Sequence, residues 1–297
     1  MLLNYKDKST IVVSTACILS LTTDRRRIRS KQISVQMAKS LIHETAIVSQ
    51  DAVVDPSVRI GPGAVIEGDV HIGGGTTIGP YAIIRRFTRI GENNLIDAHA
   101  VIGGEPQHTD YDGSETWVAI GDNNVMREFV TINRAYKPGA ETRIGSNCFF
   151  MMGAHVGHDS IVGDNVTLTN NATLAGHVEV GRNVVMGGMS ALHQFARIGP
   201  FCMVAGYTPL RKDALPFTII GGTPVRHYRL NAVGLKRNGI DGDRYRALEA
   251  AYRALRNGDR SLEGVPDTEE VRYLREWLSV KTKYGHYGFV TGGRKKR

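Results

Sequence analysis

The sequence predicts an all-β solenoid, a parallel β-helix built from six-residue repeats, followed by a small α-helical domain. First, the residues at a spacing of six over 42–210 are almost all apolar: 26 of these 29 positions hold Ile, Val, Leu, Met or Phe. Second, helical periodicity replaces this pattern over 241–258 and 267–285. We therefore expect a hexapeptide-repeat domain over 41–224 and a helical domain over 225–297.

The six-residue period suits a short strand followed by a corner, with one apolar side chain per hexad pointing inward. Three hexads complete one coil, and stacked coils pair in parallel about 4.8 Å apart. The three exceptions to the apolar pattern, His108, Ser114 and Pro138, fall within 108–119 and 133–143. We expect these two segments to be loops that project from the scaffold, where binding and catalytic residues are often placed.

The N-terminal extension, residues 1–40, shows no repeat. Its apolar run "IVVSTACILSL" (11–21) is too short to span a bilayer and is followed by "DRRRIRS". We interpret residues 1–36 as a disordered or targeting segment, with an organelle as one possible destination, and Met37 as the effective start of the fold.

The charge distribution excludes nucleic acid as a partner, although the chain has a net charge of +8 and a pI of about 9.4. Residues 1–40 carry a net +6 and the terminal "RKKR" (294–297) carries +4, so the repeat itself is not basic. The three cysteines, Cys17, Cys148 and Cys202, include no CxxC pair and imply neither a disulfide framework nor a cysteine zinc site. A reducing compartment fits this cysteine content.

Four histidines gather around one face of the repeat: His155, His158, His177 and His193. The hexads that hold the last three are spaced by one coil, so these residues lie on successive coils of that face. Three interpretations remain open on the residues alone. The histidines could form a solvated polar face, a metal site of convergent imidazoles, or a general base at His158 that Asp159 orients.

Four segments carry a resemblance to a known family: "GAHVGHDSIVG" (153–163), "NNATLAGHVEVG" (170–181), "GGMSALHQFARIG" (187–199) and "LNAVGLKRNG" (230–239). Over 42–297 the chain resembles the acyl-[acyl carrier protein]–UDP-N-acetylglucosamine O-acyltransferases, which begin lipid A biosynthesis. The resemblance implies left-handed winding of the β-helix and a cytoplasmic homotrimer with active sites between subunits. It implies no metal and no other cofactor.

The resemblance also assigns roles at the reaction centre. It makes His158 the general base, Asp159 its partner, and the backbone N–H of Gly176 the donor to the oxyanion. It places His177 and Gln194 against the sugar nucleotide.

Further substrate contacts are implied around this centre. His155 and His193 line the site, and Asn231 and Arg237 hold the phosphopantetheine arm of the acyl carrier protein. Gly206 falls at the position that measures the length of the acyl chain.

The chain departs from the family pattern in the loops. Gln107 and His108 belong to the loop that contacts the sugar nucleotide, where "QHTDY" replaces the usual "QDLKY" and also introduces Asp110. The segment "INRAY" (132–136) replaces "IHRGT". Two more departures lie in the C-terminal segment: Val233 and Asn238.

We therefore expect transfer of a 3-hydroxyacyl chain from acyl carrier protein to the 3-position of UDP-N-acetylglucosamine. The departures leave a different UDP-amino sugar open, in particular a 3-amino analogue that would be N-acylated. Two other classes remain as alternatives: a metal-dependent enzyme similar to the hexapeptide-repeat γ-carbonic anhydrases, and a non-catalytic trimeric scaffold.

Deletion of residues 1–36 is predicted to leave both folding and activity intact, because the six-residue register begins only at Ile42. Thermal unfolding and turnover of the truncated protein test this. Insolubility or loss of activity would show that the segment belongs to the fold.

Overall fold

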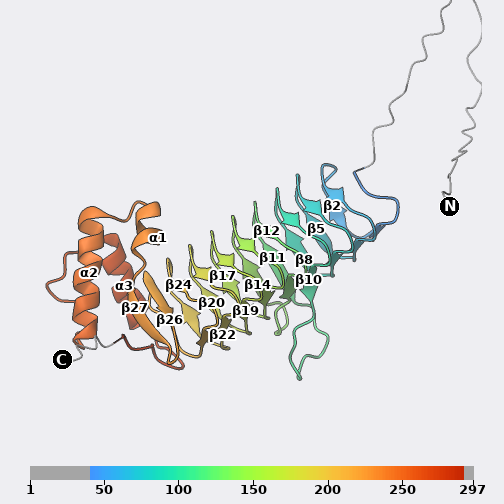
Figure 1. Cartoon of the computed structure of the whole chain (residues 1–297). Coiled ribbons are helices and arrows are strands. Elements are labelled where there is room, and N and C mark those ends of the chain that lie inside the picture. The colour runs from blue at the N-terminus through green and yellow to red at the C-terminus, as the bar shows by residue number, and fades with distance from the viewer. Residues whose placement is uncertain (1–40, 291–297) are drawn as a thin grey trace, which may run out of the picture. The chain divides into compact units, whose positions relative to one another are not determined.

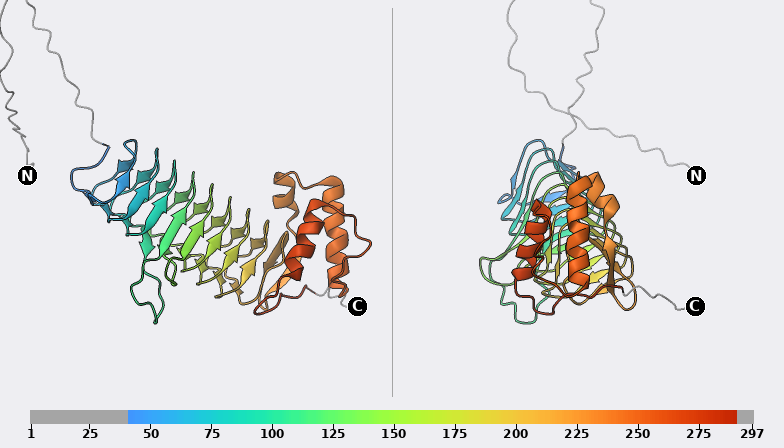
Figure 2. Two further views of the ribbon diagram at one scale, coloured as in Figure 1. Left: turned by 180° about the vertical axis from the view of Figure 1, so that it is seen from behind. Right: turned by 90° about the vertical axis from the view of Figure 1, so that its left-hand side faces the viewer.

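The computed structural model describes residues 41–290, which belong to one compact unit. The extension 1–40 lies outside the described residues, and so does its interpretation as a targeting segment. Within 41–290 the chain forms a stack of triangular coils with helices at the C-terminal end (Figure 1, Figure 2). The expected β-solenoid with a helical domain is confirmed.

Each coil contributes one short strand to each of three sheets. The first sheet has nine strands: β1 (Ile47–Val48), β4 (Val65–Ile66), β7 (Ile83–Ile84), β10 (Val101–Gly104), β13 (Thr131–Asn133), β16 (His155–Val156), β19 (Thr173–Leu174), β22 (Ala191–Leu192) and β25 (Pro209–Leu210). The second sheet has eight: β2 (Val53–Val54), β5 (Val70–Ile72), β8 (Thr88–Ile90), β11 (Trp117–Ile120), β14 (Glu141–Ile144), β17 (Ile161–Val162), β20 (Glu179–Val180) and β23 (Arg197–Ile198). The third sheet has ten: β3 (Arg59–Ile60), β6 (Thr77–Ile78), β9 (Leu95–Ile96), β12 (Val125–Met126), β15 (Phe149–Phe150), β18 (Thr167–Leu168), β21 (Val185–Met186), β24 (Met203–Val204), β26 (Thr218–Gly221) and β27 (Arg226–Leu230).

Outside the inserted loops, the apolar residue of each hexad from Val48 onward lies in a strand, and its side chain points into the coil. From Ile60 to Leu210, the repeat positions that lie in strands are at most 5% exposed. Successive coils pair in parallel, each strand beside the equivalent strand three hexads later, as where His155 lies beside Thr173. The core is therefore a set of aliphatic columns, and removing one large member, for example Leu174, would cost about 2–5 kcal/mol of stability.

Two coils are longer than the rest, and they carry the expected loops. Val101 pairs with Thr131, and Trp117 pairs with Glu141, so each of these coils exceeds the regular three hexads. The first addition is two hexads long and the second is one hexad long, and they form the loops 105–116 and 134–140. Because both additions are whole multiples of six residues, the buried apolar positions are numbered in multiples of six on both sides of each loop. His108, Ser114 and Pro138 have such numbers but lie in the loops.

The C-terminal part begins as a continuation of the third sheet. β26 pairs in parallel with β24, and β27 pairs antiparallel with β26, so the sheet continues past residue 224. Three helices follow: α1 (Ala232–Arg237), α2 (Gly242–Arg256) and α3 (Glu269–Ser279). The expectation of a helix to residue 285 was wrong, because the backbone is extended from Val280 (ψ 128°). Within 41–290, none of the helices has the length and apolar character needed to cross a bilayer.

The segment after α3 returns to the last coils and encloses His227. The Asp213 N–H donates to the carbonyl of Gly285 at 3.0 Å. His227 is fully buried; its Nε2 accepts from the Leu215 N–H at 2.9 Å, and its Nδ1 lies 3.3 Å from the Gly288 carbonyl. Burial lowers the pKa of His227 to about 4, so the folded protein holds this ring neutral.

Acid is predicted to destabilise this junction through His227. In the unfolded chain His227 takes up a proton near pH 6.5, whereas in the folded chain it does so only near pH 4. The neutral ring therefore contributes its full share of folding stability above pH 6.5, and this share is lost as the pH falls toward 4. Between pH 7 and pH 5 the loss is about 2 kcal/mol. Urea unfolding of wild type and His227→Gln at both pH values measures it. An equal pH dependence in the two proteins would contradict the assignment.

Candidate active site

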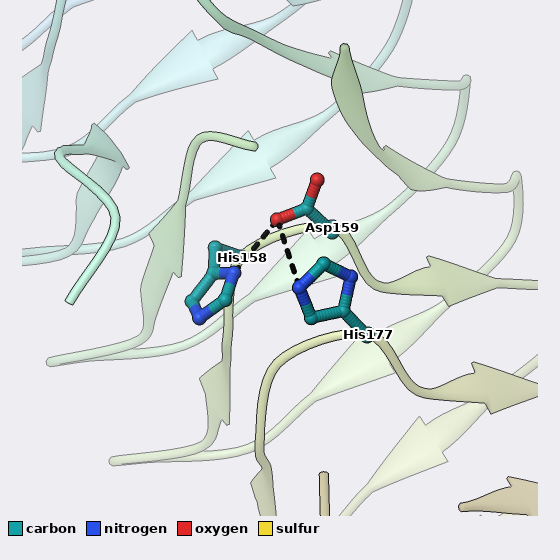
Figure 3. Close-up of side chains that lie close together, drawn as sticks. All are labelled: His158, Asp159 and His177. Carbon is teal, nitrogen blue, oxygen red and sulfur yellow. Dashed lines mark hydrogen bonds and ion pairs between the residues drawn. The ribbon is translucent and has the colours of Figure 1, made fainter. Parts of the chain in front are cut away.

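A hydrogen-bonded histidine–aspartate pair occupies the corner between β16 and β17. His158 Nδ1 lies 2.7 Å from Asp159 Oδ2 (Figure 3). Neighbouring residues on a strand point to opposite faces, but Asp159 has a left-handed backbone (φ 58°) that turns its side chain back toward His158. The corner geometry is what allows two consecutive residues to form the pair.

The Asp159 carboxylate has more than one donor. Its Oδ2 also accepts from the Tyr136 N–H at 2.9 Å, and His177 Nε2 lies 3.7 Å away. Burial opposes the charge of Asp159, but the hydrogen bonds from His158 and Tyr136 outweigh it and keep the pKa of the carboxyl below its ordinary value. An ionised carboxylate only accepts, so His158 Nδ1 carries the proton and Nε2 of the neutral ring holds a lone pair.

His177 lies one coil further along, behind the pair. Its ring meets His158 edge-on at 5.0 Å between centroids and stacks on Phe195 at 4.9 Å. The Lys283 ammonium lies 3.5 Å from the centre of the Phe195 ring. Burial lowers the pKa of His177, although Asp159 acts against this. His177 is therefore a neutral ring in a packed column.

A cavity of about 490 Å³ opens in front of His158. Its lining residues are mostly small or polar: Gln107, His108, Thr109, Asn133, His155, Gly157, His158, Thr173, Ala175, Gly176 and Gln194. The structure thus brings six of the residues expected from sequence to one cavity, with Asp159 and His177 directly behind it. His158 itself is only 6% exposed.

His155 forms one wall of this cavity. Its Nδ1 bonds to Thr131 Oγ1 at 2.8 Å. Burial, and to a lesser degree His158, lower the pKa of His155. A neutral His155 adds a polar wall without a competing charge.

The remaining expected residues lie elsewhere in the chain. His193 packs against Tyr284 at 5.4 Å and does not line the cavity. Gly206 lies at the corner between the third and first sheets, not at the corner of His158. Asn231 caps α1, with its amide donating to the Phe201 carbonyl at 2.9 Å, and Arg237 is exposed at the end of the same helix.

Sequence reasoning missed Thr173, Asn133 and Tyr136. Thr173 could have been found, because it lies one coil after His155 in the same sheet. Asn133 and Tyr136 lie at or just beyond the end of β13, where no repeat register predicts a position. Their only signal was the departure of "INRAY" from the family pattern.

Gly176 lies directly against the ring of His158. A Cβ built on it would lie 2.6 Å from both Cε1 and Nε2 of His158. Its backbone N–H has no acceptor among residues 41–290. A residue that touches the His158 ring therefore has a free backbone N–H, the kind of donor that stabilises an oxyanion in acyl transfer.

A metal interpretation has a candidate ligand set in His158, Asp159 and His177, whose donor atoms lie within 4.8 Å of one another. Two imidazoles and a carboxylate suit zinc. However, Asp159 Oδ2 already accepts two hydrogen bonds, and one of them requires a proton on His158 Nδ1. The third imidazole, His193, lies outside the cluster. This geometry fits a base and its partner better than an ion.

Known proteins share this architecture. The family pattern described as "Udp N-acetylglucosamine O-acyltransferase; Domain 2" matches residues 213–285, and "Bacterial transferase hexapeptide (six repeats)" matches 51–86, 69–104 and 141–176. An acyl-[acyl-carrier-protein]–UDP-N-acetylglucosamine O-acyltransferase of Anaeromyxobacter sp. is 40% identical over 86% of this chain and 98% of its own length. The chain belongs to this acyltransferase family.

Other members agree with the assignment. The acyltransferase of Campylobacter concisus is 41% identical over 74% of this chain and 85% of its own length. The LpxA structure from Acinetobacter baumannii has a TM-score of 0.78 and 34% identity, and covers 83% of this chain and 99% of its own. The repeats therefore form the left-handed β-helix of the family.

Gly176→Ala is predicted to reduce kcat by about 100-fold, because the new methyl group must displace the His158 ring. Gly68→Ala is the matched control: Gly68 has the same place in its hexad and the same corner, and its Cβ would meet only ordinary contacts of 3.5 Å or more. Steady-state kinetics and thermal unfolding of both variants make the comparison. Full activity of Gly176→Ala would contradict the fit.

Proposed function

We propose that this chain transfers a 3-hydroxyacyl group from acyl carrier protein to the 3-hydroxyl of UDP-N-acetylglucosamine, the first step of lipid A biosynthesis. The observation that carries the proposal is His158, whose Nδ1–H donates to ionised Asp159 and whose Nε2 faces Gly176 at a polar cavity. The membership of the acyltransferase family supplies the substrates.

The reaction needs only groups that this corner supplies. His158 Nε2 takes the proton of the sugar hydroxyl, and the oxygen attacks the thioester carbonyl carbon. The Gly176 N–H stabilises the oxyanion that forms. Collapse breaks the carbon–sulfur bond, and the departing thiolate takes the proton from His158. The products are the O-acylated sugar nucleotide and the free thiol of the carrier arm.

Ionised Asp159 stabilises the positive charge that His158 acquires during the reaction. It also fixes the tautomer in which Nε2 can accept a proton. His177 and Gln194 are proposed to contact the sugar nucleotide, and Gln107 and His155 also line the cavity.

The acting species is proposed to be a homotrimer with a site between neighbouring copies. Gly206 can measure an acyl chain that starts at His158 only if the two residues come from different copies, since they lie at different corners of one chain. Exposed apolar residues follow the corner of Gly206, as a covered surface requires: Tyr81, Phe129, Met152, Met189 and Tyr207.

Acyl carrier protein is proposed to approach α1, whose last turn holds the exposed cations Lys236 and Arg237. Arg237 and Asn231 would then meet the phosphopantetheine arm. The location of the enzyme, in the cytoplasm or in an organelle reached through residues 1–36, remains a prediction.

Purified protein incubated with 3-hydroxyacyl carrier proteins and UDP-N-acetylglucosamine is expected to yield the O-acylated sugar nucleotide by mass spectrometry. His158→Ala should lose activity by about 10²–10⁴-fold, the usual worth of a general base. His71→Ala is the control, because His71 is exposed on β5 away from the cavity.

Two further arms separate the alternatives. A chelator is expected to leave activity unchanged, and activity lost to it and restored by zinc would instead favour the metal-dependent class. The 3-amino analogue is expected to be the poorer acceptor. Absence of product with every donor and acceptor would favour the scaffold.

A further inference from the structure

Two departures from the family pattern, one in each inserted loop, are in direct contact in this chain. The rings of His108 and Tyr136 stack with centroids 4.0 Å apart and an interplanar angle of 24°. By the resemblance given above, His108 replaces the Asp of "QDLKY" and Tyr136 replaces the Thr of "IHRGT". Neither family residue could form this stack, so the two replacements form a single structural unit.

This stacked pair covers the base. The His108 ring meets His158 edge-on at 5.6 Å and 87°, and the Tyr136 ring meets it at 6.2 Å and 64°. The backbone N–H of Tyr136 also donates to Asp159 Oδ2. The pair therefore contacts both members of the dyad, and it belongs to the surroundings that leave His158 only 6% exposed.

The two loops that carry the pair are fixed to each other. The buried guanidinium of Arg134 donates to the Tyr111 hydroxyl and to the Arg86 carbonyl, both at 3.2 Å. Asn133 Nδ2 donates to the carbonyl of Glu105 at 2.6 Å. These bonds hold loop 105–116 against the start of loop 134–140. Both rings of the stacked pair are therefore carried by loops that are fixed in place.

His108 is also held from its own loop. Its Nδ1 accepts from the Asp110 N–H at 3.2 Å, which places the proton of the neutral ring on Nε2. The ring orientation is thereby set from two sides, by this bond and by Tyr136.

We propose that His108 and Tyr136 are a coupled positioning pair, which holds the His158–Asp159 dyad in its reactive geometry and shields it from water. This inference rests on the proposed function. It assigns to the pair an effect on kcat rather than on substrate binding.

The test is a double-mutant cycle that restores the family residues, with His108→Asp and Tyr136→Thr made singly and together. Each single variant is expected to lose about tenfold in kcat with KM changed by less than about twofold. The double variant should be about 3- to 10-fold more active than the product of the two single losses predicts, because the first change already removes the stack.

Conservative variants sharpen the result. Tyr136→Phe keeps both the ring and the backbone donor and should retain activity within about twofold. His71→Asp makes the same exchange at an exposed histidine away from the cavity and controls for the added charge. The proposal would be overturned if the loss of kcat in the double variant equalled the product of the two single losses within about twofold. A rise in KM without a fall in kcat would also overturn it.

A readout without turnover separates this proposal from the assigned activity. In ¹³C-histidine-labelled protein, the Cε1–H signal of His158, identified by its absence in His158→Ala, should shift in both single variants and remain in place in Tyr136→Phe. If the wild-type protein turns over no substrate, the proposed function fails, but this signal still tests whether His108 and Tyr136 position His158. An unmoved signal in both single variants would contradict the positioning role.

Discussion

The stacking of each coil on the next is the constraint on which the rest of this structure depends. One buried aliphatic side chain per hexad and a parallel ladder fix the direction in which every strand and corner points. Residues one coil apart therefore lie side by side, as His155 and Thr173 do. The site is built on positions that the core has already immobilised, so little conformational entropy remains to be lost when substrate binds.

Within this stack of coils, a single carboxylate oxygen fixes the arrangement of the site. Asp159 Oδ2 accepts from His158 and from the Tyr136 backbone, and so joins the repeat to an inserted loop. The hydrogen bonds outweigh the unfavourable burial of its charge. The consequence is a defined tautomer of His158, with the basic nitrogen on the side of Gly176, where only a residue without a side chain fits.

The repeat domain, the three-fold coil and the positions of His158, Asp159 and Gly176 could be predicted from the sequence, because a fixed period converts residue numbers into neighbours. Within the period, the prediction placed His193 at the site, whereas its ring packs against Tyr284. The prediction failed again where the period ends. It extended the last helix to residue 285, whereas the chain turns extended at Val280 and returns to the coils. Tyr136 and Asn133 were missed for the same reason: their places depend on loop hydrogen bonds, which no periodicity encodes.

The lengths of the two inserted loops have a consequence for how such a scaffold can change. Each inserted loop leaves the stack of coils and rejoins it at the same corner. The pairs Val101–Thr131 and Trp117–Glu141 therefore keep the strand register of the other coils. Loop sequence and loop length are thus decoupled from the folding of the stack. A β-helix of this kind can change the loops that form the walls of its cavity while the stacked coils that carry His158 stay in place.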